Sequence, residues 1–247
     1  MILAGVDEAG RGSVLGPLIV AGVSIEDSKI PELVSLGVKD SKLLPPKKRR
    51  YLFRKIKQLA REVTYEKILP KEIDRVVFRG ERLYRLNYLE AKAMSSVLSR
   101  LDFDRAFIDC CDTNQARFGQ LVSDLVVERE GRTFTVGERN PLFDKIVSEH
   151  HADRNYPVVS AASIIAKVTR DAYVKRLRRK HGEFGSGYPS DPGTVAYLKK
   201  VYEVSSEFPS ITRLSWITVR RLQGEVMDVE TVKTLTELIG EEVSPGI

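Results

Sequence analysis

The sequence predicts an α/β protein, because strand-like segments alternate with segments of helical periodicity along its 247 residues. Residues 2–6 and 18–25 are rich in aliphatic side chains, and the short turn at Gly16 between them is typical of an antiparallel pair. Apolar residues recur at helical spacing over residues 47–62 and 158–180. The length suits one large domain, or one domain with an appendage.

The first strand runs into an acidic turn. Asp7 and Glu8 stand side by side and are followed at once by Gly10, Arg11 and Gly12. Successive side chains of a strand point to opposite faces, so these carboxylates cannot both be buried as core, and an unpaired buried carboxylate is costly. The glycines leave backbone N–H and C=O groups open to a closely approaching ligand. We interpret this stretch as a metal and nucleic-acid site at the end of a central strand.

A dinucleotide-binding loop is the alternative interpretation of these glycines. Gly10, Gly12 and Gly16 miss its spacing by one residue, and the two preceding carboxylates would repel a pyrophosphate. The acids therefore favour the metal-site interpretation.

The helix predicted over residues 47–62 has one apolar and one basic face. Its core-facing positions are Leu52, Phe53, Ile56, Leu59, Ala60 and Val63. The basic face is most simply a solvated surface, and the alternative is that its first turn, with Lys42, lies along a phosphate backbone. The sequence then predicts strands over residues 63–69 and 105–109, a helix over residues 86–99, and strand-like pieces at residues 134–136 and 145–148.

A further acid, Asp109, closes the apolar strand 105–109 in the same way that Asp7 closes the first strand, at a place where ligand sites open in α/β sheets. Asp112 better fits a turn or a helix cap. His150 and His151 are adjacent, which is poor spacing for two ligands on one helix face. We assign these histidines a supporting role at most.

The long helix predicted over residues 158–180 changes character along its length. Its first half is small and apolar and should be buried, whereas its second half should be basic and exposed. The basic positions are Arg170, Lys175, Arg176, Arg178, Arg179 and Lys180. The N-terminus of this helix suits negative charge, such as Asp153 or a phosphate.

The chain beyond this helix predicts a loop and a small helical subdomain. Residues 185–192 form a glycine- and proline-rich loop that carries Tyr188, which can pack on the surface or stack on a sugar or base. Helices are expected over residues 194–200 and 229–239, and Trp216 should anchor the subdomain to the core. The acidic end of the chain should not lie on DNA.

Composition limits the class of protein. A hydrophobic fraction of 42% supports a sizeable core, and 40 basic against 34 acidic residues give a net charge of +6, which is compatible with a polyanionic partner. No apolar run reaches the length of a membrane span and no signal segment is visible, so we expect a cytoplasmic protein. Cys110 and Cys111 are adjacent and should be reduced, with one of them in the core.

Five motifs in order resemble the ribonuclease HII family, in its archaeal form. They are DEAGRG at residues 7–12 with the following Gly16-Pro17, DSK at residues 40–42, HHAD at residues 150–153, the adjoining SAASIIAKVTRD, and GSGYPSDP at residues 185–192. The resemblance implies a ribonuclease H-like fold, a mixed five-stranded sheet flanked by helices with a C-terminal helical extension. We expect a catalytic domain over residues 1–182 and the extension over residues 183–247.

The resemblance also implies the activity and the site. Family members are endoribonucleases that cut the RNA strand of RNA/DNA hybrids, and cut 5′ of a lone ribonucleotide in duplex DNA, leaving 3′-hydroxyl and 5′-phosphate ends. The implied catalytic and metal-binding residues are Asp7, Glu8, Asp109 and Asp153. The implied substrate-binding residues are Gly10, Arg11, Gly12, Ser41, Lys42 and Tyr188. All-carboxylate sites suit Mg²⁺ or Mn²⁺, and two such ions roughly 3.5–4 Å apart can hydrolyse a phosphodiester.

Further expectations come from comparing this sequence with the family pattern. Asn87 and Glu90 match the pattern and are expected to be structural. Ser13 stands where relatives often have proline, and we expect it to loosen the turn without removing a functional group. No peptide with a glutamine, an aliphatic residue and paired aromatics is visible at the end of the chain, which argues against sliding-clamp binding. We expect a monomer.

Two alternative functions stay open at this point. One is another nuclease of the same fold, such as a DNA-junction resolvase, which also uses clustered acids. The other is a non-catalytic nucleic-acid-binding protein that uses the basic helices. The pairing of the Gly-Arg-Gly turn with a tyrosine argues against both.

Overall fold

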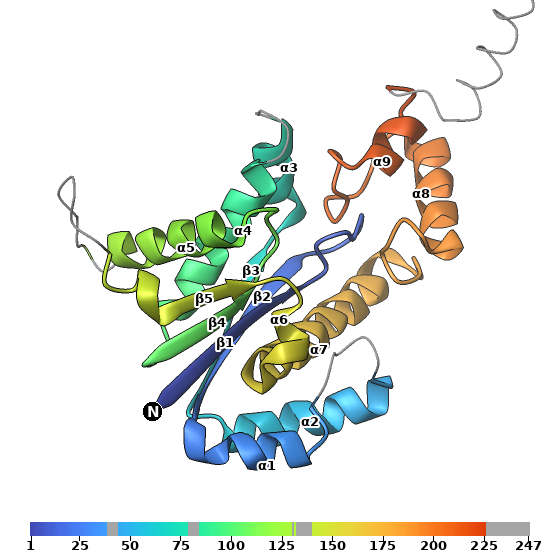
Figure 1. Ribbon diagram of the computed structural model, residues 1–247. Coiled ribbons are helices and arrows are strands. Elements are labelled where there is room, and N and C mark those ends of the chain that lie inside the picture. The colour runs from blue at the N-terminus through green and yellow to red at the C-terminus, as the bar shows by residue number, and fades with distance from the viewer. Residues whose placement is uncertain (39–43, 79–83, 130, 132–139, 226–247) are drawn as a thin grey trace, which may run out of the picture.

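A mixed five-stranded sheet forms the centre of the computed structural model, which describes residues 1–38, 44–78, 84–129, 131 and 140–225 (Figure 1). The strands are β1 (Ile2–Ala9), β2 (Leu18–Glu26), β3 (Glu62–Ile68), β4 (Arg105–Asp109) and β5 (Ile146–Glu149). Their order across the sheet is β3-β2-β1-β4-β5. β1 and β2 are antiparallel, as are β2 and β3, whereas β4 lies parallel to β1 and to β5. The predicted mixed five-stranded sheet is therefore confirmed.

Helices cover both faces of this sheet (Figure 1). On one face lie α1 (Ile30–Ser35), α2 (Pro46–Leu59) and α7 (Pro157–His181), and on the other lie α3 (Pro70–Phe78), α4 (Tyr84–Leu98) and α5 (Gln115–Arg129). The two hydrophobic clusters follow from the alternation of strand side chains. Val6 and Val20 face α4 and α5, while Ile19 and Ala21 face α7.

The start of α7 lies very close to β1, and Gly5 makes this approach possible. A Cβ atom at Gly5 would overlap the backbone of Val158 and Val159. Asp7 follows two residues later and points to the same face, so the glycine sets the distance between the helix and the acid.

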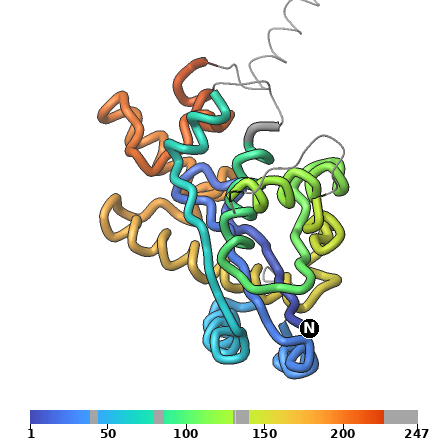
Figure 2. The backbone as a smooth tube through the Cα atoms, turned by 90° about the vertical axis from the view of Figure 1, so that its left-hand side faces the viewer, coloured from blue at the N-terminus to red at the C-terminus, as the bar shows by residue number. Residues whose placement is uncertain are grey.

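α8 (Pro192–Ser205) and α9 (Ile217–Leu222) lie at the end of β1 away from the N-terminus, as Figures 1 and 2 show from two sides. The short α6 (Ala152–Asn155) packs against the start of α7. α8 and α9 contribute to a third apolar cluster, which also contains Val14, Leu15 and Val174. Trp216 packs against this cluster and against the sheet cluster, which confirms its predicted anchoring role. The division at residue 182 stays a prediction.

Several sequence predictions need correction. The helix predicted to reach residue 62 ends at Leu59, because the chain turns extended at Ala60 to enter β3. Arg170, predicted to be exposed, is only 2% exposed because the loop after α7 folds back over it. α3 and α5 were not predicted, and α8 is longer than residues 194–200. The predicted strand at residues 134–136 and helix at residues 229–239 lie outside the described residues.

Among the described residues, no helix is both long and apolar enough to cross a membrane.

Candidate active site

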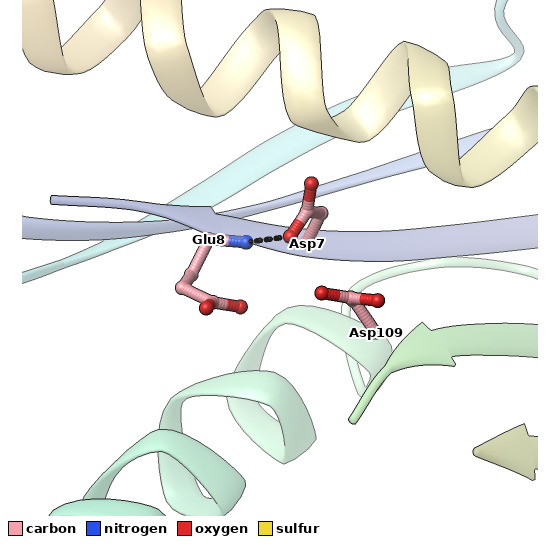
Figure 3. A group of neighbouring side chains, drawn as sticks. All are labelled: Asp7, Glu8 and Asp109. Atoms are coloured by element: carbon pink, nitrogen blue, oxygen red, sulfur yellow. Dashed lines mark hydrogen bonds between the residues drawn. The ribbon is translucent and has the colours of Figure 1, made fainter. Parts of the chain in front are cut away.

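Three carboxylates meet at the carboxyl ends of two parallel strands. β1 and β4 pair Val6 with Ile108, so the next residues along the two strands are Asp7 and Asp109. Ligand oxygens of Asp7, Glu8 and Asp109 all lie within 4.8 Å of one another. Figure 3 shows the side chains of Asp7 and Glu8 leaving β1 in different directions, with Asp109 reaching in from the end of β4.

The fourth predicted acid, Asp153, lies in α6 and lines the same cavity, although it is not one of the three tightly grouped carboxylates. His151 adopts a left-handed conformation (φ 58°) just before α6, and the Ala152 N–H donates to Asp109 Oδ1 at 2.8 Å. These contacts bring α6 to the end of β4. Asp153 is 7% exposed, and its charge is one of those that raise the pKa of Asp7.

Burial and mutual repulsion raise the proton affinity of this group. Burial is the main cause that raises the pKa of Asp7 to about 7, and the charge of Asp109 adds to it. The pKa of Glu8 is raised by burial, and then by Asp7 and Glu90. Like charges held this close favour either protonation or a bound cation.

The donor set fits a divalent cation. The Oε2 atom of Glu8 is buried and has no hydrogen-bond partner within the described part of the chain, which is costly for a carboxylate. A cation among the three carboxylates would satisfy this atom and offset the repulsion. Hard oxygen donors without nitrogen or sulfur suit Mg²⁺ or Mn²⁺ better than zinc.

A buried arginine holds the Gly-Arg-Gly turn from behind. Arg213 has no exposed surface, and its guanidinium donates to the carbonyl oxygens of Gly10 (2.7 Å), Arg11 (2.6 Å) and Gly16 (3.2 Å). Burial, followed by the nearby charge of Arg170, lowers the pKa of Arg213 to about 9. Gly10 has a φ of 94°, which strongly favours glycine. Sequence analysis missed Arg213, because nothing local to it indicates that it reaches a turn two hundred residues earlier.

The side chain of Arg11 is held on α4. It forms an ion pair with Glu90, which is fully buried, and donates to Asn87 Oδ1 at 2.8 Å. Asn87 in turn donates to Asp112 Oδ2 at 3.0 Å. The described contacts of Asn87 and Glu90 thus match the structural role predicted for them.

Asp112 forms a turn and does not line the cavity. Burial alone would raise its pKa, but hydrogen bonds from the backbone of Asn114 and the side chains of Asn87 and Arg117 lower it to about 2. The prediction that Asp112 belongs to a turn or cap is confirmed.

Tyr188 lines the acidic cavity from the loop before α8. The carbonyl oxygen of Gly187 accepts from the backbone N–H groups of Val14 (2.8 Å) and Leu15 (3.1 Å), which ties this loop to the turn after β1. The guanidinium of Arg170 lies 4.6 Å from the centre of the Tyr188 ring. The tyrosine is therefore held beside the turn and not left on an open surface.

Ser13 ties the same turn together, so the expectation that it loosens the turn is wrong. It has no exposed surface, its hydroxyl accepts from Arg170 Nη2 at 2.9 Å, and it lies 3.0 Å from the carbonyl oxygen of Gly187. A proline would lack this hydroxyl and its hydrogen bonds.

The remaining predicted residues are placed as follows. Gly10, Arg11 and Gly12 line the cavity, whereas Ser41 and Lys42 lie outside the described residues. His151 lines the cavity, and His150 Nδ1 lies 3.2 Å from the carbonyl oxygen of Cys110. Cys110 is a buried free thiol and Cys111 a partly buried one, as predicted.

The cavity itself measures about 640 Å³, within the range of small-ligand pockets. Besides the predicted residues it is lined by Arg49, Arg154, Ser163 and Lys167, none of which the sequence analysis assigned to the site. Among these residues, only Arg49 had a signal in the sequence. It lies on the basic face of the helix predicted over residues 47–62, for which contact with a phosphate backbone was the alternative interpretation.

The order of the strands and the helices on both faces define a ribonuclease H-like fold. A family model described as Ribonuclease HII matches residues 4–219. The chain belongs to the ribonuclease HII family, which places it among the endoribonucleases. Ribonuclease HII of Thermococcus sibiricus is 40% identical over 97% of this chain and 99% of its own length.

Solved structures agree with this assignment. The ribonuclease H2 of Pyrococcus horikoshii OT3 superimposes with a TM-score of 0.77 at 38% identity, covering 91% of this chain and 98% of its own. The RNase HII in the PCNA:RNase HII complex of Archaeoglobus fulgidus gives a TM-score of 0.73 at 35% identity, covering 87% and 95%. Both share the fold along nearly their full length.

Proposed function

We propose that this protein hydrolyses the RNA strand of RNA/DNA hybrids and cuts 5′ of single ribonucleotides embedded in duplex DNA, leaving 3′-hydroxyl and 5′-phosphate ends. The observation that carries the proposal is the group of three carboxylates, Asp7, Glu8 and Asp109, whose oxygens lie within 4.8 Å beside the Gly-Arg-Gly turn. Buried carboxylates with raised pKa values in a cavity indicate a functional site.

Four residues hold the metal in this proposal: Asp7, Glu8, Asp109 and Asp153. Two Mg²⁺ or Mn²⁺ ions, when bound, supply an activated water and stabilise the leaving oxygen. The chain contributes the arrangement of the ligands. The parallel register of β1 and β4 aligns Asp7 with Asp109, and the Ala152 N–H holds the Asp109 carboxylate toward α6.

Substrate recognition is assigned to Gly10, Arg11 and Gly12 with Tyr188, and to Ser41 and Lys42. The 2′-hydroxyl distinguishes RNA from DNA, and backbone groups of the turn are suited to read it because Arg213 fixes their positions. Tyr188 packs against the neighbouring sugar. Its place in the same cavity as the acids supports this role.

The test is cleavage of a DNA duplex that carries one ribonucleotide, with Mg²⁺ and with Mn²⁺. We expect one cut 5′ of the ribonucleotide, no cut in an all-DNA duplex, and no cut by the Asp7→Asn protein. Cutting of all-DNA junctions would instead indicate a resolvase. Binding that is indifferent to Mg²⁺, with no cleavage, would indicate a non-catalytic binding protein.

We propose that the protein acts as a monomer in the cytoplasm. The A. fulgidus relative was solved in complex with PCNA. Residues 223–247 of this chain contain no aromatic residue, so a clamp peptide with paired aromatics is absent from this stretch of the sequence. This argues against clamp binding through such a peptide.

A further inference from the structure

A buried carboxylate, Asp74, joins α3 to the loop of residues 206–216 between α8 and α9 (the α8–α9 loop). Asp74 is 9% exposed. Its Oδ2 atom accepts from the backbone N–H of Leu214 at 2.9 Å. Its Oδ1 atom accepts from the backbone N–H of Ser215 at 2.9 Å and from the Ser215 hydroxyl at 2.6 Å. Hydrogen bonds to a charged acceptor are stronger than neutral ones, so this carboxylate fixes the loop on α3.

The residue just before this contact is Arg213, whose guanidinium holds the Gly-Arg-Gly turn. Backbone hydrogen bonds also connect the α8–α9 loop to the chain that follows this turn. The Gly16 N–H donates to the carbonyl oxygen of Ile211 at 2.8 Å, and the Arg213 N–H donates to that of Val14 at 2.9 Å. The backbone of Arg213 therefore lies between two fixed points, the Asp74 carboxylate and the turn, and a shift of the loop would move its guanidinium.

α3 is itself anchored on the sheet, so Asp74 stands on a rigid element. Its neighbour Ile73 has no exposed surface and packs in the same apolar cluster as Val6 of β1. α3 follows β3, whose last residue, Ile68, pairs with Leu18 at the start of β2. The turn, β2, β3, α3 and the α8–α9 loop thus form a closed ring of contacts, which returns to the turn through Arg213 (Figure 1).

The charge of Asp74 acts in the same direction as its hydrogen bonds. Burial is the main cause that lowers the pKa of Arg213 to about 9, and the charge of Asp74 is among those that oppose this change. A nearby carboxylate favours the charged form of a buried guanidinium. Asp74 therefore fixes the loop and also favours the charged form of the side chain that holds the turn.

We propose that Asp74 is a positioning residue for the reaction: it fixes the α8–α9 loop, so that Arg213 holds the Gly-Arg-Gly turn in the shape that reads a ribonucleotide. The inference rests on the proposed function for the identity of the substrate. Asp74 does not line the acidic cavity, so it acts through Arg213. A misplacement of about 1 Å, caused far from the chemistry, can lower a rate about a hundredfold.

The first test is a double-mutant cycle on single-turnover cleavage of a DNA duplex with one ribonucleotide. Asp74→Ala should slow cleavage about ten- to a hundredfold per folded molecule, with the folded fraction taken from thermal denaturation. Because Asp74 acts through Arg213, the Asp74→Ala/Arg213→Gln protein should cleave within about twofold of the rate of Arg213→Gln alone, whereas independent effects would multiply.

A milder variant keeps the test decisive if Asp74→Ala is unstable. Ser215→Ala removes only one of the hydrogen bonds to Asp74, because the two backbone donors remain. Its cleavage rate should lie between those of wild type and Asp74→Ala, and it should add nothing to the loss in Arg213→Gln.

The matched control is Glu62→Ala. Glu62, at the other end of β3, is also a carboxylate that joins distant segments. Its Oε2 atom accepts from the Ser24 hydroxyl at 3.0 Å and from the backbone N–H of Asp102 at 2.7 Å. Glu62→Ala should lower the melting temperature but leave the cleavage rate per folded molecule at the wild-type value. An Asp74 with a merely structural role would behave like this control.

Amide hydrogen exchange measures the turn without relying on activity. Peptides that cover residues 10–17 should exchange faster in Asp74→Ala than in wild type, because the N–H groups of Val14, Leu15 and Gly16 donate hydrogen bonds that depend on the shape of this segment. In Glu62→Ala the same peptides should exchange like wild type.

The outcomes separate this inference from the proposed function. Three results each overturn the positioning role, even if the wild-type protein cleaves as proposed: a wild-type rate in Asp74→Ala, a loss that multiplies with that of Arg213→Gln, or unchanged exchange over residues 10–17. A wild-type protein that cleaves no duplex containing a ribonucleotide overturns the proposed function. The exchange of residues 10–17 then still decides whether Asp74 positions the turn.

Discussion

Arg213 donates a hydrogen bond to the carbonyl oxygen of Gly10 at 2.7 Å, across 203 positions of sequence. The same guanidinium binds the carbonyl oxygens of Arg11 and Gly16. Its buried charge is stabilised by backbone dipoles and by the ring of Trp216, whose centre lies 4.9 Å away, and its hydrogen bonds within the described residues go to carbonyl oxygens. The geometry of the turn thus depends on a residue of the loop between α8 and α9.

Arg213→Gln should weaken both the fold and cleavage. Each buried carbonyl left without a donor costs about 1–3 kcal/mol of unfolding free energy, and the turn loses its fixed shape. Chemical denaturation and cleavage of a hybrid measure the two effects. Arg221→Gln, at an exposed position of α9, is the control and should behave like wild type. Wild-type stability of Arg213→Gln would contradict this role.

Asp7→Asn should change how stability depends on pH when no divalent cation is present. Asp7 has a pKa of about 7 in the folded protein against 3.8 in the unfolded chain, so the folded state binds the extra proton between these values. The contribution of Asp7 to the free energy of unfolding is therefore fully present below about pH 4, and it is lost as the pH rises to about 7. Thermal melts in EDTA should show Asp7→Asn more stable than wild type at pH 8, with the advantage shrinking at pH 5.

Added Mg²⁺ completes this test. It should raise the melting temperature of the wild-type protein at pH 8, because it binds the folded carboxylates, and raise that of Asp7→Asn less. Parallel pH profiles of the two proteins in EDTA would show that Asp7 is not the group that titrates.

Gly5→Ala should destabilise the protein through α7. The new methyl group would overlap the backbone of Val158, which cannot rotate away, so the cost should reach or exceed the upper end of the about 1–3 kcal/mol typical of overpacking. Gly12→Ala is the control for stability, because none of the described residues lies within 4 Å of its added Cβ. Equal melting temperatures for the two variants would mean that α7 adjusts freely over β1.

Tyr188→Ala should slow cleavage at a single ribonucleotide by about tenfold or more, since a lost stacking contact costs about 1–3 kcal/mol. Tyr188→Phe should retain most of the activity, because it keeps the ring above Arg170. Single-turnover cleavage rates compare the two. Equal rates for wild type and Tyr188→Ala would remove the proposed role.

Local pattern predicted the elements that carry the acids. The strand predicted over residues 105–109 has the same bounds as β4, and the antiparallel pair around Gly16 is β1 and β2. These predictions succeeded because alternation and turn residues act over a few positions. That Asp7 and Asp109 share one site was implied only by the family resemblance, since the register between distant strands leaves no local mark in the sequence.

The features that sequence analysis missed depend on distant contacts. α5 contains Gly119 and several valines, which are weak helix formers, and is stabilised by packing on β5, where Gly119 approaches Ser148. Arg170 and Arg213 have no local signal of burial, because their partners are carbonyl oxygens and hydroxyls of other segments. Because this local signal is missing, helical periodicity wrongly placed Arg170 on an exposed basic surface.

The order of the strands has a consequence for synthesis on the ribosome. β1 leaves the ribosome first, yet its neighbour β4 follows about a hundred residues later and Arg213 later still. The acids of a nascent chain therefore stand apart until most of the polypeptide has emerged. The site is therefore completed only late in synthesis, after Asp109, Asp153 and Arg213 have all emerged.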